Sequence, residues 1–146
     1  MKPRIHIITL AVADLDRALT FYRDGLGFRT EGLIGAEFQG EENGPDGTTA
    51  VFHLDGGLML SIYPRPELAK DAGIPLGRAE PGDFSIGHVV ASRAEVDAVI
   101  SQAKAAGATV LDPPHDRPWK IYSGYFQDPD GHLWEVIWNP ALDGAP

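Results

Sequence analysis

The chain contains no cysteine among its 146 residues. Disulfides, thiolate zinc sites and cysteine nucleophiles are therefore excluded, and the fold must be held together by packing. Basic residues are also few, because 12 Lys and Arg stand against 21 Asp and Glu, a formal net charge of −9. Nucleic-acid and anionic-membrane surfaces draw their affinity from clustered Lys and Arg, so we expect neither partner. A basic small molecule is a more natural ligand.

The sequence also lacks a long apolar run. Residues 5–13 are too few to span a bilayer, and Asp14 and Asp16 follow at once, where a signal peptide would have a longer apolar core and small residues. We therefore expect a cytoplasmic protein. The 43% of hydrophobic residues that are present can form one well-cored domain or two small modules that share a core.

The order strand, helix, three strands is predicted twice. In the first half a β-branched run precedes a helix that Asp14 can cap, and glycines at positions 25 and 27 end it. In the second half Ser92 and Glu95 form a capping box at the start of another helix. The expected strands are 5–12, 28–38, 48–54 and 58–63, then 85–91, 109–111, 120–127 and 132–138.

These elements predict a single domain over 1–146, made of a module at 5–63, a linker at 64–83 and a module at 84–140. The linker is rich in proline and glycine and holds a short helical turn around 67–71. Residues 55–63 align with 130–138 without a gap, which sets Glu135 against Leu60. Aligning 14–16 with 95–97 sets Ile7 against His88.

Glu135 is a lone carboxylate in a strand that is otherwise apolar on both faces, next to the turn Asp128-Pro129-Asp130-Gly131. An ionised group buried in such a strand must find a proton, a cation or a metal. A solvent-facing carboxylate is the simpler alternative.

Three segments together carry a family resemblance: ITLAVADLDRALTFYRDGLGF, GHVVASRAEVDAV and GYFQDPDGHLWEVIWNP. Over residues 4–140 the chain resembles the vicinal oxygen chelate superfamily of glyoxalases, extradiol dioxygenases and bleomycin-resistance proteins. The resemblance implies an α+β fold in which two β-α-β-β-β modules form a glyoxalase-like curled mixed sheet around a cleft. It also implies metal-ligand positions on the first and last strands of each module, which here are Ile7, Leu60, His88 and Glu135.

Only His88 and Glu135 offer the nitrogen and oxygen that Mn, Fe, Ni or Zn would need, so the implied metal site is partial. In one hypothesis these two residues and a further donor hold the metal of a lyase, isomerase or dioxygenase, and Glu135 is the catalytic general base. In the second, no metal binds and the protein sequesters an aromatic or cationic ligand, as bleomycin-resistance proteins do. In the third, His88 and Glu135 are a structural hydrogen-bonded pair.

Further residues are candidates for the ligand cleft, which Ile7 and Leu60 would also line. His53 lies in a predicted strand, whereas Trp119, Tyr122 and Tyr125 lie close to the last strands and could stack on a ligand. His6 is one residue out of register with Ile7, and His115 falls in a predicted loop. We also expect a homodimer, because modules this small bury their apolar faces poorly alone and because the resemblance implies paired modules.

Overall fold

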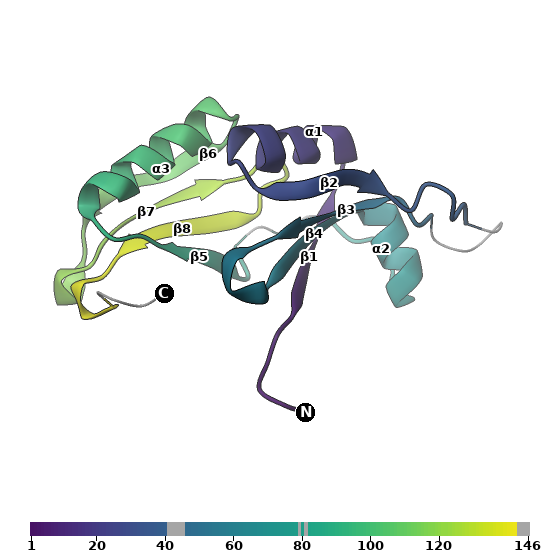
Figure 1. The fold of residues 1–146 in the computed structure, drawn as a ribbon, viewed down its shortest axis with the longest axis horizontal. Coiled ribbons are helices and arrows are strands. Elements are labelled where there is room, and N and C mark those ends of the chain that lie inside the picture. Colours follow the sequence, from purple (N-terminus) through teal and green to yellow (C-terminus); the bar gives the residue numbers. More distant parts are fainter. Residues whose placement is uncertain (41–45, 79, 81, 143–146) are drawn as a thin grey trace. The chain divides into compact units, whose positions relative to one another are not determined.

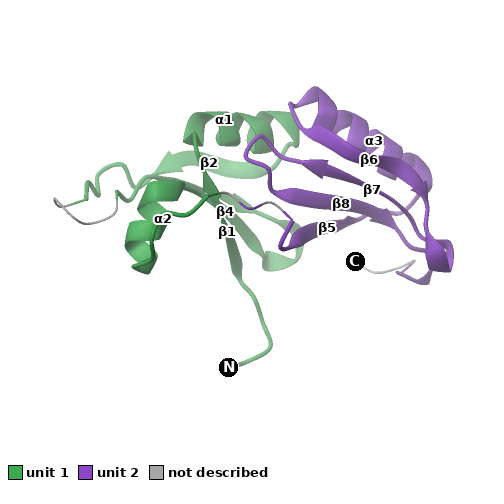
Figure 2. Ribbon diagram, turned by 180° about the vertical axis from the view of Figure 1, so that it is seen from behind, with its two compact units in different colours: residues 1–78 green, residues 79–146 purple. Residues whose placement is uncertain are grey.

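The computed structural model describes residues 1–40, 46–78, 80 and 82–142. The chain divides into two compact units, Met1–Arg78 and Ala79–Pro146 (Figure 2). Each unit contains one four-stranded sheet that carries both parallel and antiparallel pairs. This confirms the predicted α+β class with two β-α-β-β-β modules.

The first unit contains strands β1 (Ile7–Val12), β2 (Arg29–Ile34), β3 (Thr49–His53) and β4 (Met59–Pro64), and helices α1 (Leu15–Leu19) and α2 (Arg65–Ala72) (Figure 1). Its strand order is β1-β4-β3-β2, with β1 parallel to β4 and the other neighbours antiparallel. Helix α2 lies inside the segment predicted as a linker.

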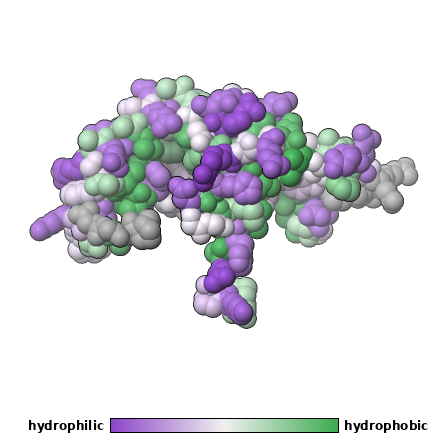
Figure 3. Space-filling view, in the orientation of Figure 1, coloured by the Kyte–Doolittle hydropathy of each residue, from purple (hydrophilic) through white to green (hydrophobic). Residues whose placement is uncertain are grey.

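Helix α1 begins where the sequence predicts it, because the Asp14 carboxylate accepts a hydrogen bond from the Arg17 backbone N–H at 2.9 Å. The chain then continues as a π-helix over Thr20–Gly25, which carries buried Phe21 and Tyr22. The Tyr22 ring lies 5.5 Å from the ring of Phe52 on β3. Hydrophilic side chains cover the outer surface of α1 in the space-filling view (Figure 3).

The second unit contains β5 (Ser85–Val89), α3 (Arg93–Ala105), β6 (Thr109–Asp116), β7 (Tyr122–Gln127) and β8 (Leu133–Trp138), in the strand order β5-β8-β7-β6. Ser92 caps α3 by accepting from the Glu95 backbone N–H at 3.1 Å, as predicted. The helix packs on β6, β7 and β8. The core between helix and sheet contains Val96, Ile100, Ala103, Phe126, Trp134 and Val136.

Each sheet therefore has two unlike faces, since side chains alternate along a strand and register partners share a face. We call the face that packs on α1 or α3 the helix face and the other the opposite face. In the second unit Phe126, Trp134 and Val136 mark the helix face, and Tyr125 and Glu135 lie on the opposite face. In the first unit Phe52 and Leu60 mark the helix face.

Strand β6 is longer than predicted, and it includes His115, which the sequence placed in a loop. Pro113 and Pro114 argued against a strand, but register shifts on both sides of Asp112 let the pairing with β7 continue past them. The β6–β7 hairpin closes at Trp119 (φ 60°) and Lys120 (φ 64°). Two positive φ angles at the centre of a tight turn are typical of a type I′ turn, which usually contains Asn and Gly.

None of the helices in the described part of the chain combines the length and the apolar character that a membrane span requires.

Candidate functional site on the second sheet

Glu135 lies on β8 and is half-buried on the opposite face of the second sheet. Its Oε1 accepts a hydrogen bond of 2.8 Å from the Ser123 hydroxyl on β7. Ser123 is fully buried, and its Oγ also accepts a 2.6 Å hydrogen bond from Nε of Arg117. A single hydroxyl thus connects a carboxylate and a guanidinium, and it fixes the orientation of both.

Arg117 extends this network to β6. Its Nη2 donates to Oδ2 of Asp112 at 2.5 Å, and Nε2 of His115 lies 3.1 Å from the same oxygen. The hydrogen bond from Arg117, and next that from His115, hold the pKa of Asp112 below its usual value. We call Asp112, His115, Arg117, Ser123 and Glu135 the polar cluster. The polar cluster contains two carboxylates and one guanidinium.

The aromatic ring of Tyr125 lies beside the polar cluster. It is the register partner of Glu135 on the same face, and Cζ of Arg117 lies 5.2 Å from its ring centroid. Burial raises the pKa of Tyr125, and a hydrogen bond with Glu135 and the charge of that carboxylate raise it further. The phenol therefore stays protonated at neutral pH and can donate a hydrogen bond.

His88 does not join Glu135, and the prediction that both point into one cleft is wrong. In the parallel pair β5–β8, Glu135 is level with Gly87, whereas His88 is level with Val136 of the helix face. Neighbouring residues on a strand point to opposite faces, so the imidazole and the carboxylate lie on opposite sides of the sheet. Partial burial lowers the pKa of His88, and the charge of Glu95 opposes this effect. The partial metal site of His88 and Glu135 therefore does not form.

Leu60 is likewise not the counterpart of Glu135, because it is buried in the core on the helix face. Ser61 occupies the corresponding place: its Oγ lies 3.1 Å from Oγ1 of Thr49, just as Glu135 contacts Ser123. Loop hydrogen bonds give the same alignment, since the Leu54 N–H donates to Leu58 O and the Asp128 N–H to His132 O. The last strands of the two halves thus correspond one residue away from the predicted register.

The counterpart of Ile7 also changes. Ile7 is level with Met59 on β4, and Ser85 is level with Leu133 on β8, so Ser85 takes the position that was predicted for His88. The helix caps agree, since Ile7 precedes the capping Asp14 by the same number of residues as Ser85 precedes the capping Ser92.

The four symmetric positions are therefore Ile7, Ser61, Ser85 and Glu135. Only Glu135 offers a strong metal ligand, because a neutral hydroxyl binds divalent ions weakly and an isoleucine side chain offers no donor. Among the described residues no group of three or more His, Asp or Glu side chains is arranged to hold a metal ion. The residues present do not fit a family-type metal centre.

Of the aromatic candidates, only Tyr125 shares a strand face with Glu135. Tyr122 lies on the helix face, where its hydroxyl donates to Asp97 at 2.9 Å and Arg93 covers its ring. Trp119 is 86% exposed at the hairpin tip. His53 is exposed at the end of β3 in the first unit.

Three members of the polar cluster were not predicted from the sequence, namely Arg117, Asp112 and Ser123. Alternation along β7 could have identified Ser123, which lies two residues before Tyr125. Arg117 and Asp112 depend on the register shifts of β6, which no pattern in the sequence announces.

A model of the Glyoxalase/Bleomycin resistance protein/Dioxygenase superfamily matches residues 4–136. Among solved structures, a glyoxalase-related enzyme from Fulvimarina pelagi is similar at 28% identity and a TM-score of 0.77, covering 94% of this chain and 89% of that one. Lactoylglutathione lyase from Agrobacterium tumefaciens is similar at 26% identity and a TM-score of 0.67, covering 99% and 98%. Among curated proteins, none matches the chain.

Proposed function

Since the chain belongs to the Glyoxalase/Bleomycin resistance protein/Dioxygenase superfamily, we propose that it binds a small basic aromatic molecule over the opposite face of its second sheet, without a family-type metal centre. The observation that carries this proposal is the pairing of the oriented Glu135 carboxylate with the Tyr125 ring on one sheet face. A carboxylate beside an aromatic ring is complementary to a cation attached to an aromatic body.

The charge of the polar cluster supports a cationic ligand. Arg117 is engaged by Asp112 and Ser123, so its positive charge is largely offset within the cluster. Glu135 accepts from the Ser123 hydroxyl through Oε1 and also hydrogen-bonds Tyr125, and its remaining lone pairs are those through which it would meet the ligand. The net charge of −9 adds a long-range attraction for cations that falls with ionic strength.

A second candidate is an isomerase or lyase reaction in which Glu135 moves a proton of the substrate as a general base. The similarity to a lactoylglutathione lyase favours it. Residues Ile7, Ser61 and Ser85 count against its metal-dependent form, because they supply no adequate ligand set.

The two candidates can be separated with three probes of similar size: 2-phenylethylamine, 2-phenylethanol and phenylacetate. Calorimetry should show that the amine binds more tightly than the other two probes. Glu135→Gln should lower the affinity for the amine by about tenfold and leave the circular dichroism spectrum unchanged. Glu95→Gln, an exposed carboxylate at the start of α3, is the matched control. Equal amine binding by wild type and Glu135→Gln would refute the proposal.

Metal content should be measured on protein purified without chelator or histidine tag. Substoichiometric Mn, Fe, Ni and Zn would support metal-free binding. One metal per chain that is lost in Glu135→Gln would contradict it and favour the second candidate.

A further inference from the structure

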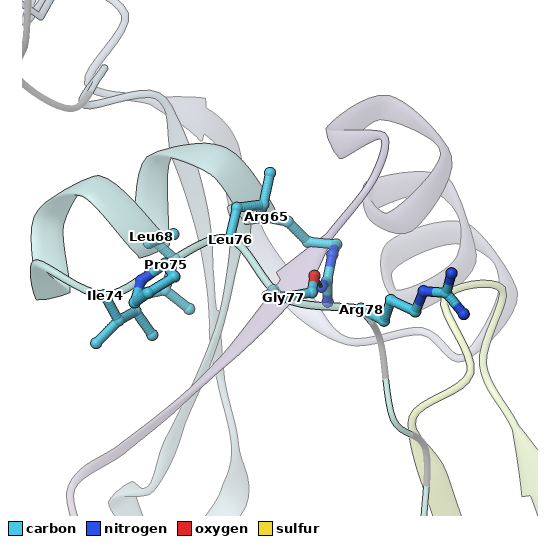
Figure 4. A pocket seen from close by; sticks show the side chains of 9 residues that line it. Arg65, Leu68, Ile74, Pro75, Leu76, Gly77 and Arg78 are labelled. Atoms are coloured by element: carbon cyan, nitrogen blue, oxygen red, sulfur yellow. Dashed lines mark hydrogen bonds between the residues drawn. The ribbon is translucent and has the colours of Figure 1, made fainter.

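The first unit contains a cavity of about 290 Å³ that is unrelated to the polar cluster, and every residue that lines it lies between positions 11 and 78 (Figure 4). This volume is close to the lower end of the range for small-ligand sites, about 300 Å³. Its apolar lining consists of Ala11, Leu68, Ala69, Ile74, Pro75 and Leu76.

The cavity exists because the chain turns back after α2. Gly73 ends the helix in the left-handed region (φ 65°), and the Ile74 N–H donates to Ala69 O at 3.0 Å. Residues 74–77 then return along the helix, and we call them the return segment. Arg65, at the start of α2, holds its far end by donating from Nη2 to Gly77 O at 2.7 Å.

The return segment leaves apolar surface uncovered. Ile74 and Leu76 are each 59% exposed, whereas Ala69 beneath them is 8% exposed. On the sheet side, Ala11 lies on β1 and its small side chain leaves room above the strand. The result is an apolar hollow, open on one side, between α2, the return segment and β1.

Charge identifies the class of ligand. Among the described residues that line the cavity, the only charged side chains are those of Arg65 and Arg78, although the chain as a whole is strongly acidic. Figure 4 shows the Arg65 guanidinium turned toward Gly77 beside the return segment and Arg78 extended away from the apolar residues. Arg65 uses one N–H on Gly77 O, and a guanidinium has five, so donors remain for an anion.

We propose that this cavity binds a small carboxylate with an apolar body, whose carboxylate pairs with Arg65 while its body lies on Leu68 and the return segment. The inference does not depend on the polar cluster or on the proposed function, because no residue is shared. Arg65 is the specificity-determining residue, since it lies closest to the apolar lining.

The test uses three eight-carbon probes, octanoate, octylammonium and 1-octanol, added to the whole protein and followed by amide NMR shifts. Octanoate should shift the amides of Leu68, Ile74, Leu76 and Gly77, and it should bind at least about tenfold more tightly than octylammonium. Arg65→Gln should lower octanoate affinity by about tenfold and leave 1-octanol affinity unchanged. Arg29→Gln, on the far edge strand β2, is the matched control and should change neither.

Because Arg65→Gln could also loosen the return segment, a second variant leaves the arginine in place. Ala11→Ile places a larger side chain in the cavity, and isoleucine is a residue that strands favour. The variant should lower the binding affinities for octanoate and 1-octanol equally. The proposal would be overturned by equal affinities for octanoate and octylammonium, or by shifts confined to other residues. It would also be overturned if a second copy of the chain covered the cavity and octanoate did not displace it.

Discussion

Ser123 offers the sharpest test of the polar cluster, because its buried hydroxyl serves two charged groups. Replacing it with alanine removes the 2.8 Å bond to Glu135 and the 2.6 Å bond from Arg117. A hydrogen bond to a charged group contributes about 1.5–3 kcal/mol, and half-buried partners regain some water, so Ser123→Ala should lower the free energy of unfolding by about 2–3 kcal/mol. Urea denaturation with linear extrapolation measures this difference.

The first unit supplies a matched control. Ser61 is also buried, but among the described residues its hydroxyl contacts only the neutral Thr49 hydroxyl, at 3.1 Å, so Ser61→Ala should lower the free energy of unfolding by about 0.5–1 kcal/mol. A double-mutant cycle of Ser123→Ala with Glu135→Gln should give a coupling above about 0.5 kcal/mol. Equal costs for the two serine variants, or a coupling of zero, would refute the view that Ser123 orients a charged site.

Three further outcomes are expected. Gly124→Ala should destabilise the protein by about 1–3 kcal/mol, because its Cβ would lie 2.9 Å from the Pro114 backbone nitrogen, whereas Gly87→Ala, which meets only a side chain at 3.6 Å, should change unfolding little. The phenolate absorbance that is lost in Tyr125→Phe should titrate above the usual tyrosine pKa of about 10, and its pKa should move down in Glu135→Gln. The stabilising effect of the raised pKa is complete below pH 10 and is lost as the pH rises through the folded pKa, and a titration that Glu135→Gln does not move would contradict the contact. Sedimentation at micromolar concentration should give twice the 15.7 kDa of one chain, and a monomer would count against the expected homodimer.

The fold could be predicted because its signals are local. Asp14 and Ser92 cap their helices as expected, and apolar alternation identifies the strands that build both sheets. The end of β6 could not be predicted, since bulges carry the strand past two prolines that would break a regular ladder. The superposition of the two modules stays a prediction.

The site was harder, because it depends on register. A shift by an odd number of residues moves a side chain to the other face of a sheet, and both errors have this form, with one residue between Leu60 and Ser61 and three between Ser85 and His88. The face of His88 was predicted from the alternation along its own strand alone, whereas the structure pairs His88 with Val136, which lies on the helix face. Leu60 was aligned through a shared Asp-Gly pair, whereas loop hydrogen bonds align Gly57 with Gly131, both at positive φ.

The strained tip of the β6–β7 hairpin carries a tryptophan whose fluorescence can report on the protein. Trp119 is 86% exposed, while Trp134 is 5% exposed and stacked at 6.0 Å on Phe126. A water-soluble collisional quencher such as iodide will therefore reach the indole at the tip far more readily than the one in the core. Once the third tryptophan, half-buried Trp138, is replaced by phenylalanine, emission that survives the quencher follows unfolding of the second unit, and the quenched fraction follows the hairpin whose base is held by the hydrogen bond from Arg117 to Ser123. Both events can be read in one cuvette without a label.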